Sequence, residues 1–203
     1  MSDVEIIDHG WNRIRGELLK LGSMDIRVGV QDAGKAAGGM SMANLAALHE
    51  FGSREWQITP KQAYYMARVL FGIDPDAEPD RFWGTVRTLK KRTLRIPERS
   101  FLRATVDADA AVMDVAKERV LDAVIAGKMT ADEAADQYGF FVVGRIKKRI
   151  AGGIDPPNAA LTVALKSRGT GSATPLVNTG QLINSITHKV RLQSSGTSKK
   201  APT

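Results

Sequence analysis

The alternating stretch Met24-Asp-Ile-Arg-Val-Gly-Val30 gives the first indication of the fold. Its four apolar side chains fall on one side, and this period of two is typical of a β-strand that buries one face. The stretch Thr187 to Leu192 alternates again and predicts a closing strand. Helical patterns fill most of the remaining chain. We therefore expect a single α+β domain over residues 1–192, in which a small, mostly antiparallel sheet packs against several helices.

The helices are predicted from apolar side chains that recur at helical spacing. Residues 4–21 and 41–49 are predicted helices, and Ser41 is a candidate N-cap for the second. Residues 100–128 are predicted to be mostly helical, with a break near Asp107. The side chains expected to face inward from this segment are Val112, Val115, Ala116, Val120, Ala123 and Val124.

Thr130-Ala-Asp-Glu133 has the residue types of a capping box. In this motif the Thr130 hydroxyl accepts a hydrogen bond from the Glu133 amide, and the Glu133 carboxylate accepts one from the Thr130 amide. We therefore expect a helix that begins here and continues to about Ile150. A further helical turn or two is expected over residues 180–186.

Residues 52–96 are the least regular part of the chain. Trp56 and Ile58 favour a strand, whereas residues 63–67 fit a strand or a helix equally well. Two prolines between Asp74 and Asp80 indicate a loop. The following residues, 82–96, mix β-branched and basic side chains, so they are predicted to form a strand or hairpin with an exposed basic side.

Composition excludes several classes of protein. The chain has 203 residues, of which 43% are hydrophobic and 25% charged, as expected for a globular protein. It has no cysteine, which excludes disulfide frameworks and thiolate chemistry. The start of the chain lacks a basic region followed by an apolar run, so we expect no signal peptide, no secretion and no membrane span. Residues 193–203 are polar and predicted to form a flexible tail.

The formal net charge of +7 is distributed in blocks of opposite sign. Residues 85–103 are strongly basic, and residues 104–136 are mostly acidic. Three interpretations are open. The blocks form solvated faces that keep the protein in solution, the basic block binds nucleic acid, or both blocks take part in self-association.

Candidate metal sites are incomplete. His49-Glu50 begins like a zinc-binding helix motif, but the second histidine is replaced by Ser53. The acidic residues within 74–80 recur like the ligands of a calcium loop, but Pro79 and Thr85 stand where that loop needs glycine and glutamate. We expect no metal site in this chain.

Phosphate-binding and catalytic motifs are incomplete as well. Gly34-Lys35 lacks the remainder of a P-loop, and residues 169–174 lack the third glycine of a dinucleotide-binding fingerprint. No histidine pair, acid cluster or nucleophile–base spacing supports a hydrolase or nuclease. We therefore expect no enzymatic activity and no cofactor.

Four segments, in order and spacing, resemble the neck and tail-completion proteins of tailed bacteriophages, also called virion morphogenesis or head–tail joining proteins. The segments are Ile26-Arg-Val-Gly-Val30, Leu45-Ala-Ala-Leu-His-Glu-Phe-Gly52 leading to Ile58-Thr-Pro-Lys61, Ile96-Pro-Glu-Arg-Ser-Phe-Leu-Arg103, and Pro175-Leu-Val-Asn-Thr-Gly-Gln-Leu-Ile-Asn-Ser-Ile186. Ser100 stands where such proteins often have proline.

The residues that carry this resemblance are expected to be structural. In the second segment, His49 and Glu50 precede Phe51 and Gly52. Phe51 is expected to anchor the helix in the core, and Gly52 is expected to end the helix in a left-handed conformation. In the third, Pro97 is expected to end a strand before Phe101 and Leu102 begin a helix. In the fourth, the expected N-cap and the helix that follows it comprise Thr179, Gly180, Leu182, Ser185 and Ile186.

The resemblance implies a non-enzymatic structural protein of the virion, located in the neck or tail region and assembled in the cytoplasm of the bacterial host. Such a subunit forms a closed ring, a hexamer or a dodecamer, at the head–tail joint or at the tail terminator. Its implied partners are its own copies, the neighbouring connector, neck and tail proteins, and genomic DNA that passes through the lumen without sequence-specific contacts. Residues 31–39, residues 167–174 and the tail are expected to become ordered when neighbouring rings dock.

A ring needs a head-to-tail interface, and the two charge blocks are candidates for its two sides. We expect a basic side of one subunit to contact an acidic helix face of the next. The candidate basic residues are Arg87, Lys90, Lys91, Arg92 and Arg95, and the candidate acidic residues are Asp107, Asp114, Glu118 and Asp122. The alternative is a basic nucleic-acid-binding or regulatory protein.

Overall fold

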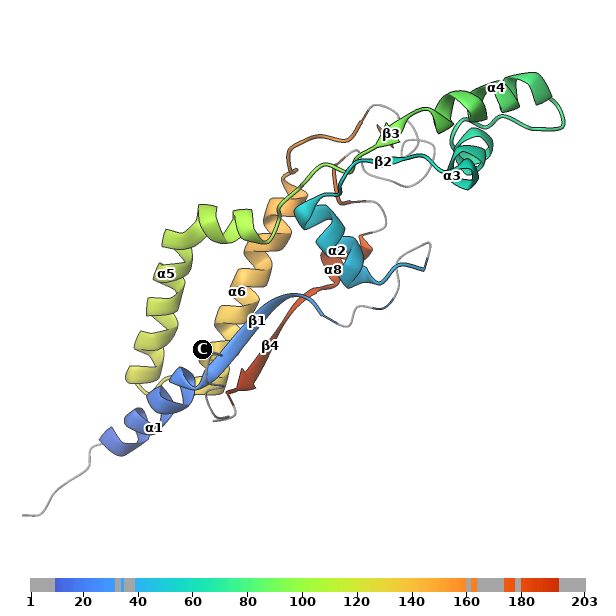
Figure 1. The fold of residues 1–203 in the computed structure, drawn as a ribbon. Coiled ribbons are helices and arrows are strands. Elements are labelled where there is room, and N and C mark those ends of the chain that lie inside the picture. The colour runs from blue at the N-terminus through green and yellow to red at the C-terminus, as the bar shows by residue number, and fades with distance from the viewer. Residues whose placement is uncertain are drawn as a thin grey trace, which may run out of the picture.

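The computed structural model of the chain describes residues 10–31, 34, 39–159, 162–163, 174–177 and 180–193. Its elements are α1 (Trp11–Gly22), β1 (Met24–Val30), α2 (Met42–Phe51), β2 (Trp56–Gln57), α3 (Pro60–Tyr65), the π-helical turn η1 (Met66–Leu70), α4 (Pro79–Lys90), β3 (Thr93–Leu94), α5 (Arg103–Ile125), α6 (Ala131–Ala151), α8 (Gln181–Asn184) and β4 (Ile186–Leu192). The fold is α+β, as predicted, and its two sheets are each a two-stranded antiparallel pair. Figure 1 shows a body from which residues 54–95, called the arm below, project.

The larger sheet confirms both strand predictions. β1 pairs with β4 in antiparallel register from Met24 opposite Leu192 to Val30 opposite Ile186. The amide of Gln193 continues the pairing and donates a 2.7 Å hydrogen bond to the carbonyl of Ser23. Because side chains alternate along a strand, the apolar positions of both strands share one face, and the sheet lies against α6 (Figure 1).

α6 is the central helix of the body. Its predicted capping box is present between Thr130 and Glu133. Ile146 and Ile150 are buried on this helix. They pack in a core whose other buried members are Met42, Ala46, Phe101, Met113, Val142, Val143, Ile154, Leu182 and Ile186.

α5 packs against α6 and is continuous from Arg103 to Ile125, so the predicted break near Asp107 is wrong. Asp107 is exposed on the surface of this helix, and the helix continues through it without interruption. The ion pair between Asp109 and Arg145 of α6, at 2.7 Å, stabilises this packing. Two of the side chains predicted to face inward, Val112 and Val115, are 45% and 47% exposed.

The arm has a core of its own, which comprises Ile58, Ala63, Ala67, Ile73, Phe82, Val86 and Leu89. The predicted strand or hairpin over residues 82–96 is therefore mostly wrong, because residues 82–90 belong to helix α4. Pro79 occupies the first turn of α4, where its missing amide costs nothing, and the three buried side chains of α4 recur at helical spacing. Of the two possibilities left open for residues 63–67, the helical one is observed.

Several predictions lie outside the described residues. These are residues 4–9 of the first helix, Thr179 as an N-cap, most of the loops at 31–39 and 167–174, and the tail from residue 194. In the described part of the chain, no helix is both long and apolar enough to cross a membrane.

Candidate subunit interface

The second and third of the four resembling segments meet at the base of the arm. The amide of Ser53 donates to the carbonyl of Ile96 at 2.9 Å, and the amide of Ile96 donates to the Ser53 hydroxyl at 2.8 Å. One turn further into α2, the carbonyl of His49 accepts a 2.7 Å hydrogen bond from the amide of Arg99. The two ends of the arm are therefore fastened to each other by short hydrogen bonds.

Glu50 organises this junction. Its side chain is 3% exposed, and its carboxylate accepts hydrogen bonds from the amides of Phe101, Leu102 and Arg103 at 2.8, 2.9 and 3.0 Å. The Ser100 hydroxyl donates a further bond at 2.7 Å. Glu50 thus satisfies amides at the N-terminus of α5, where the helix dipole also favours a negative charge. Burial alone raises the pKa of Glu50, but these hydrogen bonds outweigh it and hold the pKa below its ordinary value.

Phe51 is not the core anchor that its position in the segment predicts, because its side chain is 64% exposed. α2 buries Met42, Ala46 and Glu50, which recur every four residues, and Phe51 lies one position beyond this face. Its ring instead lies under the guanidinium of Arg103, with 4.8 Å between the guanidinium carbon and the ring centroid. Arg103 also pairs with Glu50 at 3.2 Å, so it covers the buried carboxylate from outside.

Gly52 permits the close approach of the two segments. A Cβ at this position would lie 2.8 Å from the amide nitrogen of Glu98 and 2.9 Å from the carbonyl oxygen of Ile96. Gly52 does not have the left-handed helical conformation that the sequence predicts: its φ is positive, at 69°, but its ψ of −170° leads the chain into an extended path. Pro97 lies in the returning segment, between β3 and α5.

The first and fourth segments contribute β1, α8 and the start of β4 to the body core. Leu182 is 5% exposed and Ile186 is fully buried, and both pack in the same core as Phe101 and Met42. Gly180 has a left-handed conformation immediately before α8, and Leu102 packs at the edge of this core. The Ser185 hydroxyl donates to the carbonyl of Leu182 at 2.7 Å. The four segments therefore build the body core and the base of the arm rather than an exposed site.

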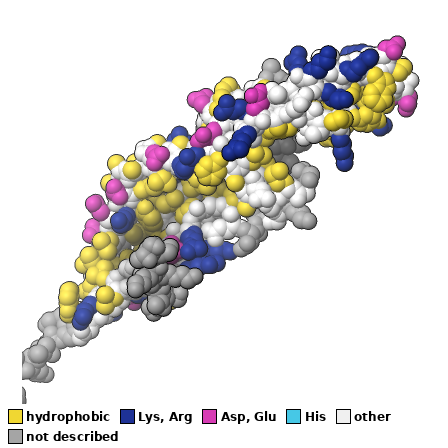
Figure 2. All heavy atoms as spheres, in the orientation of Figure 1, with side chains coloured by type: hydrophobic (Ala, Val, Ile, Leu, Met, Phe, Trp, Pro, Cys, Tyr) yellow, Lys and Arg dark blue, Asp and Glu magenta, His cyan; other side chains and the backbone are white. Residues whose placement is uncertain are grey.

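The five candidate basic residues lie together on the arm, at the end of α4 and along β3. Arg87 and Lys90 belong to α4, Lys91 caps it, and Arg92 and Arg95 flank β3. All five are exposed, and within the described residues none of them forms an ion pair. Figure 2 shows Lys and Arg side chains gathered along the arm.

The four candidate acidic residues lie on one face of α5. Their positions, Asp107, Asp114, Glu118 and Asp122, fall within an arc of about 80° at 100° per residue. All four are exposed, and none takes part in an ion pair with another described residue. The structure does not bring the acidic and basic sets together within one chain, because α5 lies on the body far from α4 (Figure 1).

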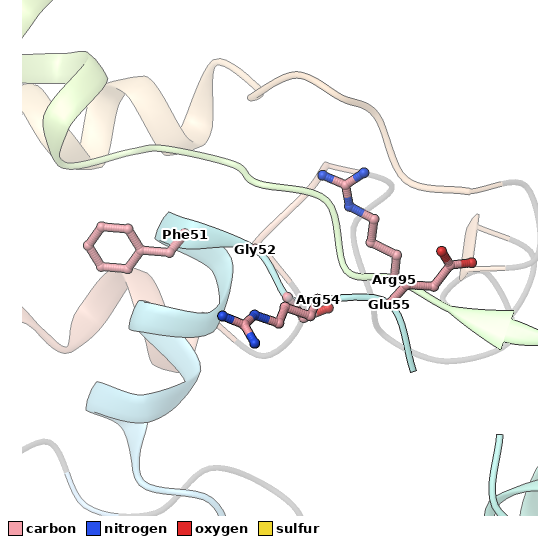
Figure 3. Close-up of a pocket in the computed structure, with 6 residues that line it drawn as sticks. Phe51, Gly52, Arg54, Glu55 and Arg95 are labelled. Atoms are coloured by element: carbon pink, nitrogen blue, oxygen red, sulfur yellow. The ribbon is translucent and has the colours of Figure 1, made fainter. Parts of the chain in front are cut away.

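A shallow pocket of about 430 Å³ lies where the arm joins the body, lined by Phe51, Gly52, Ser53, Arg54, Glu55 and Arg95. Figure 3 shows that the labelled Arg95, Glu55 and Phe51 side chains point in different directions and do not converge on a common point. Specific small-molecule sites need several convergent polar groups. This pocket does not offer them.

The described residues hold no group of three or more His, Asp or Glu side chains placed to bind a metal ion. In the acidic loop before α4, Asp74 is engaged in its own turn, where its carboxylate accepts a 2.9 Å hydrogen bond from the amide of Asp76. That contact is an ordinary turn interaction.

Sequence patterns did not predict two features, an exposed aromatic pair and a buried arginine. Trp83 and Tyr64 lie near each other on the arm, with 6.2 Å between ring centroids, and their side chains are 50% and 36% exposed. Arg99, in contrast, is buried and donates to the carbonyls of Pro156 and Pro157 at 2.8 and 3.1 Å. The exposure of Trp83 becomes visible only once residues 79–90 are recognised as a helix with Phe82 facing inward.

Comparisons of the chain with protein-family models, with curated proteins and with solved structures find no match.

Proposed function

We propose that the chain is a structural subunit of a tailed-bacteriophage virion, which forms a ring at the neck or tail-completion position and surrounds the DNA channel. The observation that carries the proposal is the separation of unpaired charges, with cations on a projecting arm and anions on the distant helix α5. Each set lacks an ion-pair partner within the described chain. Copies of the chain can supply that partner to one another.

A contact between two different surfaces of one subunit is heterologous, and repetition of such a contact closes into a ring when its rotation permits. The fastened base of the arm supports this use, because hydrogen bonds between Ser53 and Ile96 hold the two ends of the arm to each other. An arm with its own core keeps its shape outside the body and presents its surface to a neighbour.

The assignment to the neck of a phage rests on the resemblance of the four segments. The packing of these segments supports it indirectly, since they build the shared core and the base of the arm. The connector and the tail proteins are the expected neighbours, DNA passes through the lumen, and the virion is the expected location.

Particles that lack the chain test this function. In a phage whose genome encodes it, an amber mutation in the gene is expected to leave filled heads and separate tails in electron micrographs, and infectious particles are expected to return when the chain is supplied in trans. Infectious phage produced without the chain, or turnover of a substrate by the purified chain, overturns the proposal.

A second candidate function is binding to a nucleic-acid backbone, which the exposed Trp83 beside the basic end of α4 favours, since bases stack on exposed aromatic rings. Binding through the five basic residues of the arm predicts that log K falls with log salt with a slope of about −4 to −5. Tight, salt-dependent binding of DNA by the monomeric chain would favour this candidate over the first.

A further inference from the structure

One side of α4 combines an aromatic ring with cations. Trp83, Arg87 and Lys90 recur at intervals of four and three residues, so they share one stripe of the helix. Trp83 is 50% exposed although it contacts Phe82 edge to face, with 5.3 Å between ring centroids. The guanidinium Nε of Arg87 donates to the backbone carbonyl of Trp83 at 3.3 Å, which holds the Arg87 side chain along the helix surface. We call Trp83, Arg87 and Lys90 the arm stripe.

The acidic face of α5 has an apolar neighbour. Asp114 and Glu118 lie near the centre of the face, while Val115 lies along its edge and is 47% exposed. We call these three residues the α5 face. It therefore presents anions beside uncovered apolar surface, the complement of a stripe that presents cations beside an uncovered aromatic ring.

We infer that the arm stripe of one copy docks on the α5 face of a second copy, with Trp83 covering Val115 while Arg87 and Lys90 pair with Asp114 and Glu118. This inference rests on the proposed ring and identifies its interface. Trp and Arg are the residue types that most often dominate binding energy at protein interfaces.

The same chain cannot satisfy both surfaces by folding back, because the arm projects away from the helix that it would have to reach (Figure 1). Charge complementarity selects a second copy as the occupant. A nucleic acid would pair with the arm stripe but would be repelled by the α5 face, and it would leave Val115 uncovered.

Charge reversal on each side tests the inference with the full-length chain. The arm variant carries Arg87→Glu and Lys90→Glu, and the face variant carries Asp114→Lys and Glu118→Lys. In each variant alone the two surfaces have the same sign, so self-association measured by sedimentation at low salt is expected to weaken by about 10-fold or more. In an equimolar mixture each arm meets a face of opposite charge, so assembly is expected to return with the two variants alternating.

Native mass spectrometry distinguishes the outcomes, because alternation gives assemblies with equal numbers of both variants. The matched control Lys61→Glu with Arg68→Glu makes the same charge change elsewhere on the arm and is expected to leave assembly unchanged. A wild-type chain that stays monomeric at low salt and high concentration overturns the inference, and so does a mixture that fails to associate although both variants give the wild-type circular dichroism spectrum.

Trp83→Ala adds an uncharged test, since it is expected to weaken self-association by about 10-fold or more while Tyr65→Ala, an exposed aromatic on α3, has little effect. Equal effects of the two substitutions would contradict the role given to Trp83. These results are separate from the proposed phage function. If the two variants alternate as expected but infectious particles form without the chain, the interface stands and the neck function is rejected. If the chain is essential for infectious particles but the mixed variants do not associate, the neck function stands and the interface is rejected.

Discussion

The carboxylate of Glu50, in the last turn of α2, accepts a 2.8 Å hydrogen bond from the amide of Phe101, which lies 51 residues later and two residues before α5. Between these two residues the chain leaves the body, forms the whole arm and returns. The contact therefore determines where the arm begins and ends. It also joins two motifs whose relation is invisible from their separate positions in the sequence.

Glu50→Gln is expected to destabilise the body by about 2–4 kcal/mol. The glutamine side chain has one acceptor oxygen in place of two. Some of the backbone amides of Phe101, Leu102 and Arg103 therefore lose their hydrogen-bond acceptor at a buried site. Denaturant unfolding followed by circular dichroism measures the loss.

Glu98→Gln provides the control. Glu98 is exposed and also contacts Arg103, at 2.6 Å, so its removal takes away an ion pair of the same arginine without touching the helix N-terminus. Its effect on the free energy of unfolding is expected to be below about 1 kcal/mol. Equal losses in the free energy of unfolding in both variants would show that Glu50 stabilises the protein through Arg103 and not through the amides that it caps.

The pH dependence of stability follows from the same carboxylate. The pKa of Glu50 in the folded protein lies below its ordinary value of 4.5, so folding favours the ionised form. This contribution is fully present above about pH 5 and is lost as the pH falls through the folded pKa. Wild-type stability is therefore expected to fall more steeply than that of Glu50→Gln when both are unfolded between pH 5 and pH 3. Parallel curves would contradict the assignment.

Local patterns in the sequence were sufficient for the body strands and for the central helix. Alternation in Met24–Val30 reflects one buried face, and Thr130 with Glu133 forms a complete cap within four residues. In both cases the residues that determine the structure are neighbours in the chain, so no knowledge of the fold is needed.

The arm and the junction depend on contacts between distant segments. Residues 82–90 have several β-branched side chains, yet they fold as a helix because Phe82, Val86 and Leu89 find a small core supplied by Ala63 and Ala67. The burial of Glu50 was equally invisible, because its partners lie beyond the arm. For the candidate interface, the sequence indicated which charges belong together, but the exposure of Trp83 required the structure.

Gly139→Ala is expected to destabilise the contact between α6 and β4. A Cβ at this position would lie 2.6 Å from Cγ of His188, so the imidazole ring must move from the place where it contacts Phe140 and Asp136. Overpacking of this kind costs about 1–3 kcal/mol, which exceeds the gain of at most about 1 kcal/mol that alanine brings to a helix interior. Thermal unfolding measures the net loss.

Gly144→Ala in the same helix is the matched substitution. No atom lies within 4 Å of a Cβ built at Gly144, so only the helix-propensity term operates and the melting temperature is expected to rise. A melting temperature that falls in Gly139→Ala and rises in Gly144→Ala identifies the close approach of β4 as the cause. A rise in both variants would mean that the His188 ring moves aside without cost.

Removal of the arm tests whether the body holds its own fold. Gln57 pairs with Thr93 in the ribbon of β2 and β3, so Asn-Gly inserted directly between them is expected to close a two-residue hairpin in place of residues 58–92. The body core shares no buried residue with the arm core, and the Ser53–Ile96 hydrogen bonds remain, so cooperative unfolding and the protection of β1 amides from hydrogen exchange are expected to persist.

Phe82→Ala in the full chain is the companion variant, because it disrupts the arm core and is expected to remove protection there while β1 stays protected. Loss of β1 protection in either variant would show that the two cores fold as one unit.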